Sequence, residues 1–462
     1  MDGIRNVVLI TVDCLRADHL PSYGYERDTA PFLDGLAEES TVYENAIAAG
    51  CGTPASFPSI LSSTFPFDYG GYNGITDERP YLPELVSDAD VTTGGFHSNT
   101  YLTEAFGYGR GFDEFESFRS DDADEPDAAT RISRSIDHDS VLYRMLRRLH
   151  GLISMPTNSA PYLPADDLTD RVKSWVSDRR SPFFLWTHYM DPHAPHQPPS
   201  RHYRRFGDDA PTWNSHQQQW RDAVDEPSAV DSHSREQFID AYDAEIRFVD
   251  EQLERLFETF ESTGAYEETL FLITADHGEG FGEHGFYGHP PGVFEELVHV
   301  PLMVHDPRDG ETRRVDDPVS LLSIAPTVLD GLGVEPPSSF RDTSLLDRAG
   351  TASAGVFSEV CEEAGGGFEI QPYDRSRAIV GYRTSRFKYV RDRQSDCEAL
   401  YDLHEDPGER TDRSDDHPDR LERARDRVER HLDDVRPAES EHDVSVTADV
   451  AERMAELGYV EE

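Results

Sequence analysis

Lysine is almost absent from this chain of 462 residues. Lys173 and Lys388 are the two lysines, so 41 of the 43 basic residues are arginine, against 91 acidic residues. The formal net charge is −48, and the acidic residues run along the whole chain instead of gathering in one tail. The sequence has no basic stripe of the kind that follows a phosphate backbone, which argues against nucleic acid as a partner.

Acidity spread so evenly is typical of proteins that stay hydrated in concentrated salt. There, screening shortens the repulsion between like charges to a few ångströms. We therefore expect halophilic adaptation, and not an acidic surface built for a basic partner.

A long apolar run is also missing. The run 6-NVVLITVD-13 has the length of a strand, and a membrane-spanning helix needs about 20 apolar residues. The chain does not open with a charged and then apolar leader, so we expect a cytoplasmic protein with no transmembrane segment. The four cysteines lack the paired spacing of a structural metal site and are expected to be reduced.

Short apolar runs at 7–12, 183–190, 269–274 and 300–305 predict buried strands. Apolar residues recur every three or four positions over 236–260, which predicts an amphipathic helix. Strands that alternate with helices indicate an α/β fold with a mixed, mostly parallel sheet sandwiched by helices.

The pattern changes beyond about residue 350. Runs at 354–360, 376–392 and 398–403 predict a small antiparallel sheet, followed by helices near 418–434 and 447–457. We therefore divide the chain into a catalytic domain over 1–350, a small α+β subdomain over 351–415 and an acidic helical tail over 416–462. The charged segment 119–165 reads as a surface excursion with a short helix near 140–150.

Polar residues follow two of the predicted strands directly. Asp13 ends the first, and Asp276 with His277 ends the strand over 269–274. Ligand sites of such sheets form beyond the carboxyl ends of the strands. Two carboxylates and an imidazole that meet there predict a divalent-metal site, although each Asp alone could simply cap the next helix.

The stretch 50-GCGTPASFPSILSSTFP-66 holds two candidate nucleophiles, Cys51 and Thr53. Thr53 followed by proline is typical of a helix start, with Thr53 as the N-cap, where a hydroxyl can meet an anionic substrate or merely cap the helix. His193 and His289 lie near the predicted active edge, where an imidazole can bind an oxyanion or protonate a leaving group.

These motifs together resemble the sulfatase family of the alkaline phosphatase superfamily. The resemblance runs over most of the chain, through 7-VVLITVDCLRADHLPSYGY-25, 97-HSNTYLTEAFGYGRGFDEFE-116, 184-FLWTHYMDPHAPHQPP-199, 273-ITADHGEGFGEHG-285 and 400-LYDLHEDPGER-410. It implies an alkaline-phosphatase-like sheet and hydrolysis of sulfuric or phosphoric esters. It also points to Asn99, in a stretch where sulfatases place a Lys and a His, as a substrate-binding residue.

Sulfatases carry a Cys-x-Pro-Ser-Arg signature whose Cys or Ser becomes formylglycine. The register of the following helix, 59-SILSSTFP-66, puts Thr53 at that position and Phe57 in place of the signature Arg. Threonine cannot become formylglycine. The resemblance therefore implies a metal-activated Thr53 nucleophile, and one metal ion held by Asp13, Thr53, Asp276 and His277.

Where sulfatases usually have Asp-Asp and Asp-Asn, this chain has Asp13-Cys14 and Asp276-His277. Fewer oxygen ligands favour manganese or zinc over calcium, which stays possible. We predict cleavage of a small-molecule, glycan-linked or lipid-linked sulfate or phosphate ester. The alternatives are a phosphodiesterase or phosphoglycerol-type transferase, and a non-catalytic sulfatase-like binding protein.

Overall fold

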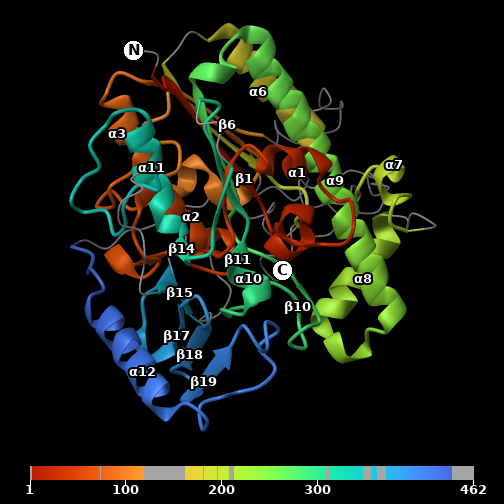
Figure 1. The fold of residues 1–462 in the computed structure, drawn as a ribbon, viewed down its shortest axis with the longest axis vertical. Coiled ribbons are helices and arrows are strands. Elements are labelled where there is room, and N and C mark those ends of the chain that lie inside the picture. The colour runs from red at the N-terminus through yellow and green to blue at the C-terminus, as the bar shows by residue number, and fades with distance from the viewer. Residues whose placement is uncertain are drawn as a thin grey trace, which may run out of the picture.

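A computed structural model gives the fold of the chain (Figure 1). It describes residues 3–72, 74–118, 162–179, 182–194, 196–207, 213–308, 312–346, 355–361 and 371–439. The helices predicted near 140–150 and 447–457 lie outside the described residues, as does the predicted tail beyond residue 439.

Eight strands form the central sheet in the order β13-β2-β12-β8-β1-β7-β5-β6. Strand β12 runs antiparallel to both of its neighbours, and the other neighbouring pairs are parallel. The predicted mixed, mostly parallel sheet is therefore confirmed. The strands are β1 (Asn6–Val12), β2 (Thr41–Tyr43), β5 (Thr92–His97), β6 (Glu114–Ser117), β7 (Phe183–Tyr189), β8 (Thr269–Ala275), β12 (Leu302–His305) and β13 (Arg313–Val315).

Strand β1 lies in the middle of this sheet, between β7 and β8. In register, Thr11 is opposite both His188 of β7 and Thr274 of β8. All three strands are buried along their whole length, which explains their continuous apolar sequence. Because they are parallel, their carboxyl ends meet at one edge, and Asp13 and Asp276 leave the sheet side by side.

Helices cover both faces of the sheet, with α6 and α9 along one side and α2, α3 and α11 along the other (Figure 1). Helix α9 extends the predicted 236–260 helix by a few residues at each end. Within the described ranges, none of the helices combines the length and apolar character that a membrane span needs. The helices are α1 (Pro31–Ala37), α2 (Thr53–Ser62), α3 (Leu82–Ser87), α6 (Ala165–Asp178), α7 (Ser200–Tyr203), α8 (Trp213–Asp225), α9 (Ser232–Thr263), α10 (Glu295–Val298), α11 (Ile324–Gly331) and α12 (Pro418–Asp433).

A separate antiparallel sheet follows in the order β15-β17-β18-β19, with α12 packed against β17 and β18. These are the strands and the helix predicted beyond residue 350. Residues 347–354 lie outside the description, so the boundary at 350 stays a prediction. The strands are β15 (Val356–Cys361), β17 (Ala378–Arg383), β18 (Phe387–Asp392) and β19 (Cys397–Asp402).

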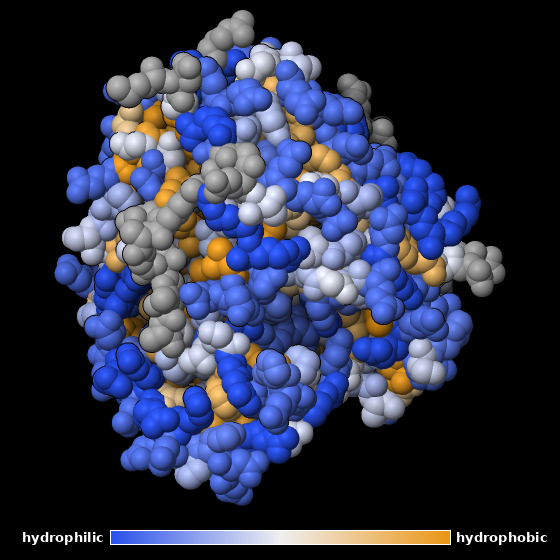
Figure 2. Space-filling model, viewed as in Figure 1, coloured by the Kyte–Doolittle hydropathy of each residue, from blue (hydrophilic) through white to orange (hydrophobic). Residues whose placement is uncertain are grey.

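Three smaller sheets complete the described fold. One of them is the hairpin of β9 and β10, and His289 directly follows β10. On the face drawn in Figure 2, hydrophilic residues dominate and hydrophobic ones are scattered, as the acidic composition leads one to expect. The short strands are β3 (Ala46–Ile47), β4 (Gly71–Tyr72), β9 (Gly280–Phe281), β10 (Tyr287–Gly288), β11 (His299–Val300), β14 (Val319–Ser320) and β16 (Gln371–Pro372).

Candidate active site

Two carboxylates, a hydroxyl and an imidazole meet at the carboxyl edge of the sheet. Thr53 Oγ1 lies 2.9 Å from Asp276 Oδ2, 3.4 Å from Asp13 Oδ2 and 3.4 Å from His277 Nε2. Asp13, Asp276 and His277 have no exposed surface, and Thr53 is 2% exposed. The structure therefore brings together all four residues that the sequence predicted around one metal ion.

The start of helix α2 aims Thr53 into this cluster. Gly52, and not Thr53 as predicted, is the N-cap, and its carbonyl accepts from the N–H groups of Ala55 and Ser56. Thr53 is the first helical residue, and its hydroxyl donates to Asp276 instead of capping the helix. The hydroxyl thus lies at the positive end of the helix dipole, beside two carboxylates.

The imidazole of His277 directs a lone pair at the carboxylates. Its Nδ1 lies 2.9 Å from the carbonyl oxygen of Gly278, which can only accept, so Nδ1 carries the proton in the neutral ring. Its Nε2 then faces Asp13 Oδ1 at 3.4 Å and Asp276 Oδ2 at 3.6 Å. In the neutral ring this lone pair faces two carboxylates, an arrangement that a divalent cation among them would stabilise, so the donor set fits such a cation.

The charges of the site perturb one another strongly. Burial raises the pKa of Asp13, but the neighbouring imidazoles, His193 foremost, outweigh it and hold that pKa below the usual value. Burial and the nearby Asp13 carboxylate raise the pKa of Asp276. Burial lowers the pKa of His277, yet the two carboxylates more than offset this and raise it. One carboxyl thus holds its charge while its partner resists ionising, as expected of two acids that lie close together.

Asn99 contacts the predicted nucleophile directly. Its Oδ1 accepts from the backbone N–H of Tyr101, which fixes the orientation of the amide. Its Nδ2 then donates to Asp13 Oδ2 at 2.9 Å and lies 3.4 Å from Thr53 Oγ1.

Reasoning from the sequence did not give His188 a role. Its Nε2 lies 3.1 Å from Asp13 Oδ2, and its Nδ1 lies 3.0 Å from Thr11 Oγ1. Phe57, at the position of the signature Arg, packs edge-on against the same ring with 5.0 Å between centroids. The sequence did hold a signal for this residue, because the run 183-FFLWTHYM-190 places a histidine near the end of a mostly apolar strand.

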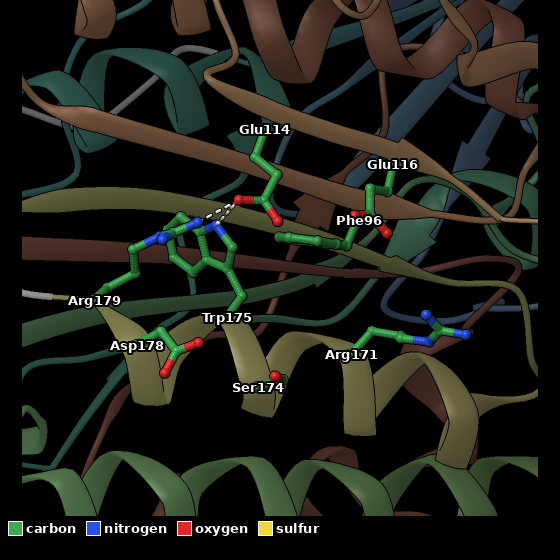
Figure 3. A pocket seen from close by; sticks show the side chains of 8 residues that line it. All are labelled: Phe96, Glu114, Glu116, Arg171, Ser174, Trp175, Asp178 and Arg179. Carbon is green, nitrogen blue, oxygen red and sulfur yellow. Dashed lines mark hydrogen bonds and ion pairs between the residues drawn. The ribbon is translucent and has the colours of Figure 1, made fainter.

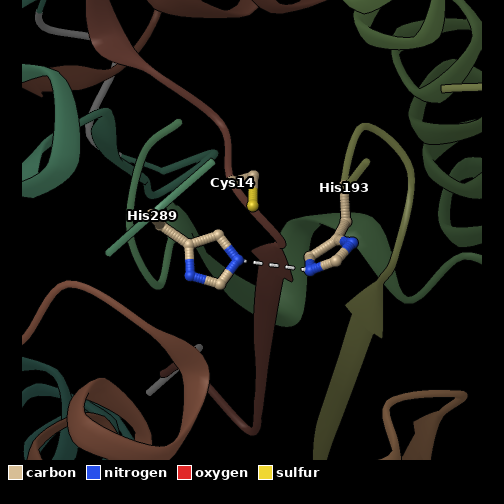
Figure 4. A group of neighbouring side chains, drawn as sticks. All are labelled: Cys14, His193 and His289. Carbon is tan, nitrogen blue, oxygen red and sulfur yellow. Dashed lines mark hydrogen bonds between the residues drawn. The ribbon is translucent and has the colours of Figure 1, made fainter. Parts of the chain in front are cut away.

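His193 and His289 face each other, with 3.4 Å between their Nε2 atoms (Figure 4). His289 also packs on His277, with 4.6 Å between ring centroids. Burial lowers the pKa of both His193 and His289, so their neutral forms are favoured.

Cys14 is a second residue that the sequence reasoning left without a role. Its Sγ lies 3.3 Å from Asp13 Oδ1 and 3.7 Å from His277 Nδ1. Its backbone takes a left-handed conformation with φ of 57°, and the Tyr242 hydroxyl donates to its carbonyl at 2.6 Å. The other cysteine near the site differs: Cys51 Sγ lies 3.6 Å from the carbonyl oxygen of Pro290.

A surface pocket of about 200 Å³ lies elsewhere, between β5, β6 and α6 (Figure 3). Glu114 crosses it to pair with Arg179 and to accept from Trp175 Nε1. None of the predicted site residues lines this pocket, so it takes no part in the candidate site.

Comparison with known proteins identifies the family of the chain. The profile of the Sulfatase family matches residues 5–334, and that of the N-sulphoglucosamine sulphohydrolase C-terminal region matches residues 282–437. The arylsulfatase of Clostridium perfringens is 25% identical over 88% of this chain and 89% of its own. The multifunctional alkaline phosphatase superfamily protein PehA of Trinickia caryophylli is 23% identical over 74% of this chain and 76% of its own.

Solved structures share the fold. The phosphonate monoester hydrolase of Agrobacterium radiobacter superposes with a TM-score of 0.71 at 20% identity, over 93% of this chain and 95% of its own. BT4656 in complex with its substrate D-glucosamine-2-N,6-O-disulfate gives 0.70 at 18% identity, over 93% and 98% of the two chains. The family profile spans well over half of the sequence, and the chain therefore belongs to the sulfatase family, as a hydrolase with an alkaline-phosphatase-like fold.

Proposed function

We propose that this sulfatase-family hydrolase cleaves phosphate or sulfate esters by attack of Thr53 Oγ1 on the phosphorus or sulfur atom. The observation that carries the proposal is the contact of this hydroxyl with Asp276, Asp13 and His277. Cys51, the other candidate, points to a backbone carbonyl instead.

Each residue then has a defined part. As Thr53 Oγ1 forms its new bond, its proton passes to Asp276 Oδ2, which already accepts it at 2.9 Å. Asn99 Nδ2 holds Oγ1 and Asp13 in place. The bond to the leaving alcohol breaks. His193 or His289, which face each other beside the cluster, binds the substrate oxygens or, when protonated, gives its proton to the departing oxygen.

Asp13, Asp276, His277 and Thr53 are the residues that would hold one divalent cation. Bound there, it would supply a Lewis acid that lowers the pKa of the Thr53 hydroxyl and neutralises charge on the substrate. Divalent-metal dependence is general among sulfatase and phosphonate hydrolase relatives. A nitrogen ligand in a set of few carboxylates favours Mn²⁺ or Zn²⁺ over Ca²⁺.

The nucleophile favours phosphorus over sulfur. Formylglycine releases sulfate by elimination from a hydrated aldehyde, which threonine cannot form. A threonine sulfate would have to be broken by direct attack on sulfur, whereas a threonine phosphate yields to water or to a second alcohol. The fold shared with a phosphonate monoester hydrolase is consistent with this preference, and the substrate alcohol is a small molecule, a glycan or a lipid headgroup.

The test is a panel of aryl phosphate monoesters, aryl phosphate diesters and aryl sulfates, assayed with Mn²⁺ in high salt, followed by acid quench and peptide mass spectrometry. We expect turnover of a phosphate ester and a phosphoryl group on the peptide that contains Thr53. Glycerol added as an acceptor separates a transferase from a hydrolase. A formylglycine at position 51, or no turnover of any ester by metal-loaded protein, would contradict the proposal, and the latter would favour a binding protein.

A cytoplasmic location, predicted from the lack of a leader and of a long apolar run, and adaptation to high salt, predicted from the composition, stay predictions from the sequence.

A further inference from the structure

A thiol and two imidazoles lie together beside the carboxylate cluster, and the mechanism above does not use the thiol. Cys14 Sγ and one ring nitrogen from each of His193 and His289 all lie within 4.8 Å of one another (Figure 4). They come from three separate loops: the end of β1, the loop after β7 and the loop after the β9–β10 hairpin. Cys14 and His193 are buried, and His289 is partly exposed.

The hydrogen bonding of His193 turns a lone pair towards this point. Its Nδ1 is within hydrogen-bond distance of the Ala194 carbonyl oxygen, which can only accept, so the neutral ring carries its proton on Nδ1. Its Nε2 is then an acceptor, and it faces His289 Nε2. A neutral imidazole nitrogen with a lone pair is the form that binds metals.

The spacing of these nitrogens suits a shared cation better than a direct hydrogen bond. The two Nε2 atoms are 3.4 Å apart, longer than the ~2.7–3.2 Å of ordinary N–H hydrogen bonds. Two histidine nitrogens bound tetrahedrally to one zinc ion at about 2.0–2.1 Å lie roughly 3.3 Å apart. A thiolate at about 2.3 Å from the same ion lies roughly 3.6 Å from each nitrogen, and in the structure these atoms lie within 4.8 Å of one another.

We propose that Cys14, His193 and His289 bind a second divalent cation, of the soft Zn²⁺ class, next to the cation site of Asp13, Asp276 and His277. One sulfur and two nitrogen ligands select zinc over magnesium, calcium or manganese. Cys14 also lies beside Asp13 and His277, so its sulfur stands between the two sites.

Buried carboxyl groups lie near this point, and a second cation would favour their ionised forms. Asp13, Asp276 and Glu279 are all buried without exposed surface, and Glu279 lies close enough to Cys14 to affect its thiol. Three protein ligands leave a fourth tetrahedral position open. A substrate oxygen could bind the cation at that position, and would then contact the cation instead of the two imidazoles. This inference rests on the proposed function only in placing the substrate at this position.

The test is metal stoichiometry, measured on the full chain after chelation, titration with Zn²⁺ and equilibrium dialysis. We expect two zinc ions per chain in the native sequence and one in His289→Ala. Co²⁺ provides a second readout, because a cobalt–thiolate bond gives a near-ultraviolet charge-transfer band. We expect this band in the native sequence and in Cys51→Ser, the matched thiol control, and its loss in both Cys14→Ser and His289→Ala.

One zinc ion per native chain would overturn the inference without recourse to any variant. A cobalt–thiolate band that survives His289→Ala would also overturn it, because Cys14 would then belong to the carboxylate site alone. Failure of the proposed function would be seen in a different measurement, namely turnover that survives Thr53→Ala. That outcome would not alter the zinc count or the cobalt band of the native protein.

Discussion

His188 Nε2 lies 3.1 Å from Asp13 Oδ2, and both side chains are fully buried. The contact joins two neighbouring strands, since His188 is on β7 and Asp13 directly follows β1. Phe57 packs on the imidazole at the place where the sulfatase signature has an arginine. In this chain, an imidazole from the sheet therefore faces the carboxylate, and the signature position supplies an apolar wall behind it.

His188 is accordingly a positioning residue for Asp13. We expect His188→Ala to weaken binding of the first cation by about 10–100-fold, as loss of a partner of a metal ligand usually does. His188→Gln, whose amide can still donate to Asp13, should recover part of that affinity. Isothermal titration with Mn²⁺ measures both variants, and equal affinity in His188→Ala and the native protein would contradict the role.

Thr53→Ala should abolish turnover, with a loss on the order of 10⁴–10⁶-fold, as for other nucleophile knockouts. Thr53→Ser keeps the hydroxyl and should retain measurable activity. Cys51→Ser, two residues away, should turn over substrate like the native protein. Steady-state rates on the best aryl ester measure all three variants. An inactive Cys51→Ser together with an active Thr53→Ala would show that Cys51, and not Thr53, is the nucleophile.

Chelation should remove activity and also lower the melting temperature. A ligand at about 100 times its Kd stabilises the folded state by about 2.7 kcal/mol, and its removal leaves the Asp13 and Asp276 carboxyls buried together without that charge. In Asp13→Asn, the shift of melting temperature on adding EDTA should shrink or vanish. Calorimetry with and without EDTA measures this, and an unchanged shift in the variant would show that the stabilising cation binds elsewhere.

Lys388 should hold the C-terminal sheet to the catalytic domain. Its side chain is 1% exposed, and its ammonium nitrogen lies 3.0 Å from Glu295 Oε1 and 2.9 Å from Glu409 Oε1. Removing one partner of a buried ionic group costs about 3–5 kcal/mol, so Lys388→Met should lower the free energy of unfolding by that order.

Lys173, the other lysine of the chain, provides the matched control for this substitution. It lies partly exposed on α6, and Lys173→Met should change stability by no more than about 0.5 kcal/mol. Denaturant titration at fixed salt compares the two, and equal effects would disprove the structural role of Lys388.

The net charge of −48 predicts that salt stabilises the fold. The Debye length falls from ~10 Å at 0.1 M to ~3 Å at 1 M salt, so repulsion among surface carboxylates is screened. The melting temperature should therefore rise from 0.1 M to several molar KCl. A melting temperature that is highest at low ionic strength would contradict halophilic adaptation.

Local pattern was enough for the strands and the long helix. The apolar runs at 7–12, 183–190 and 269–274 became β1, β7 and β8, because strands buried on both faces need continuous apolar sequence. The period of the 236–260 segment likewise gave α9, whose apolar stripe faces the core. The N-cap of α2 was misplaced by one residue, since Thr53 and Gly52 are both acceptable caps and the difference lies in what the Thr53 hydroxyl meets.

The order of residues along the chain was enough to predict which groups gather at the site: two carboxylates, a hydroxyl and imidazoles placed after strands whose carboxyl ends share one edge. Which of these groups touch became visible only in the folded chain. The pairing of β1 with both β7 and β8 brings His188 to Asp13, and Cys14, with its left-handed backbone, has its thiol near both the Asp13–His277 pair and the His193–His289 pair. Such contacts depend on strand order and register across more than a hundred residues of chain, and no local pattern encodes these distances.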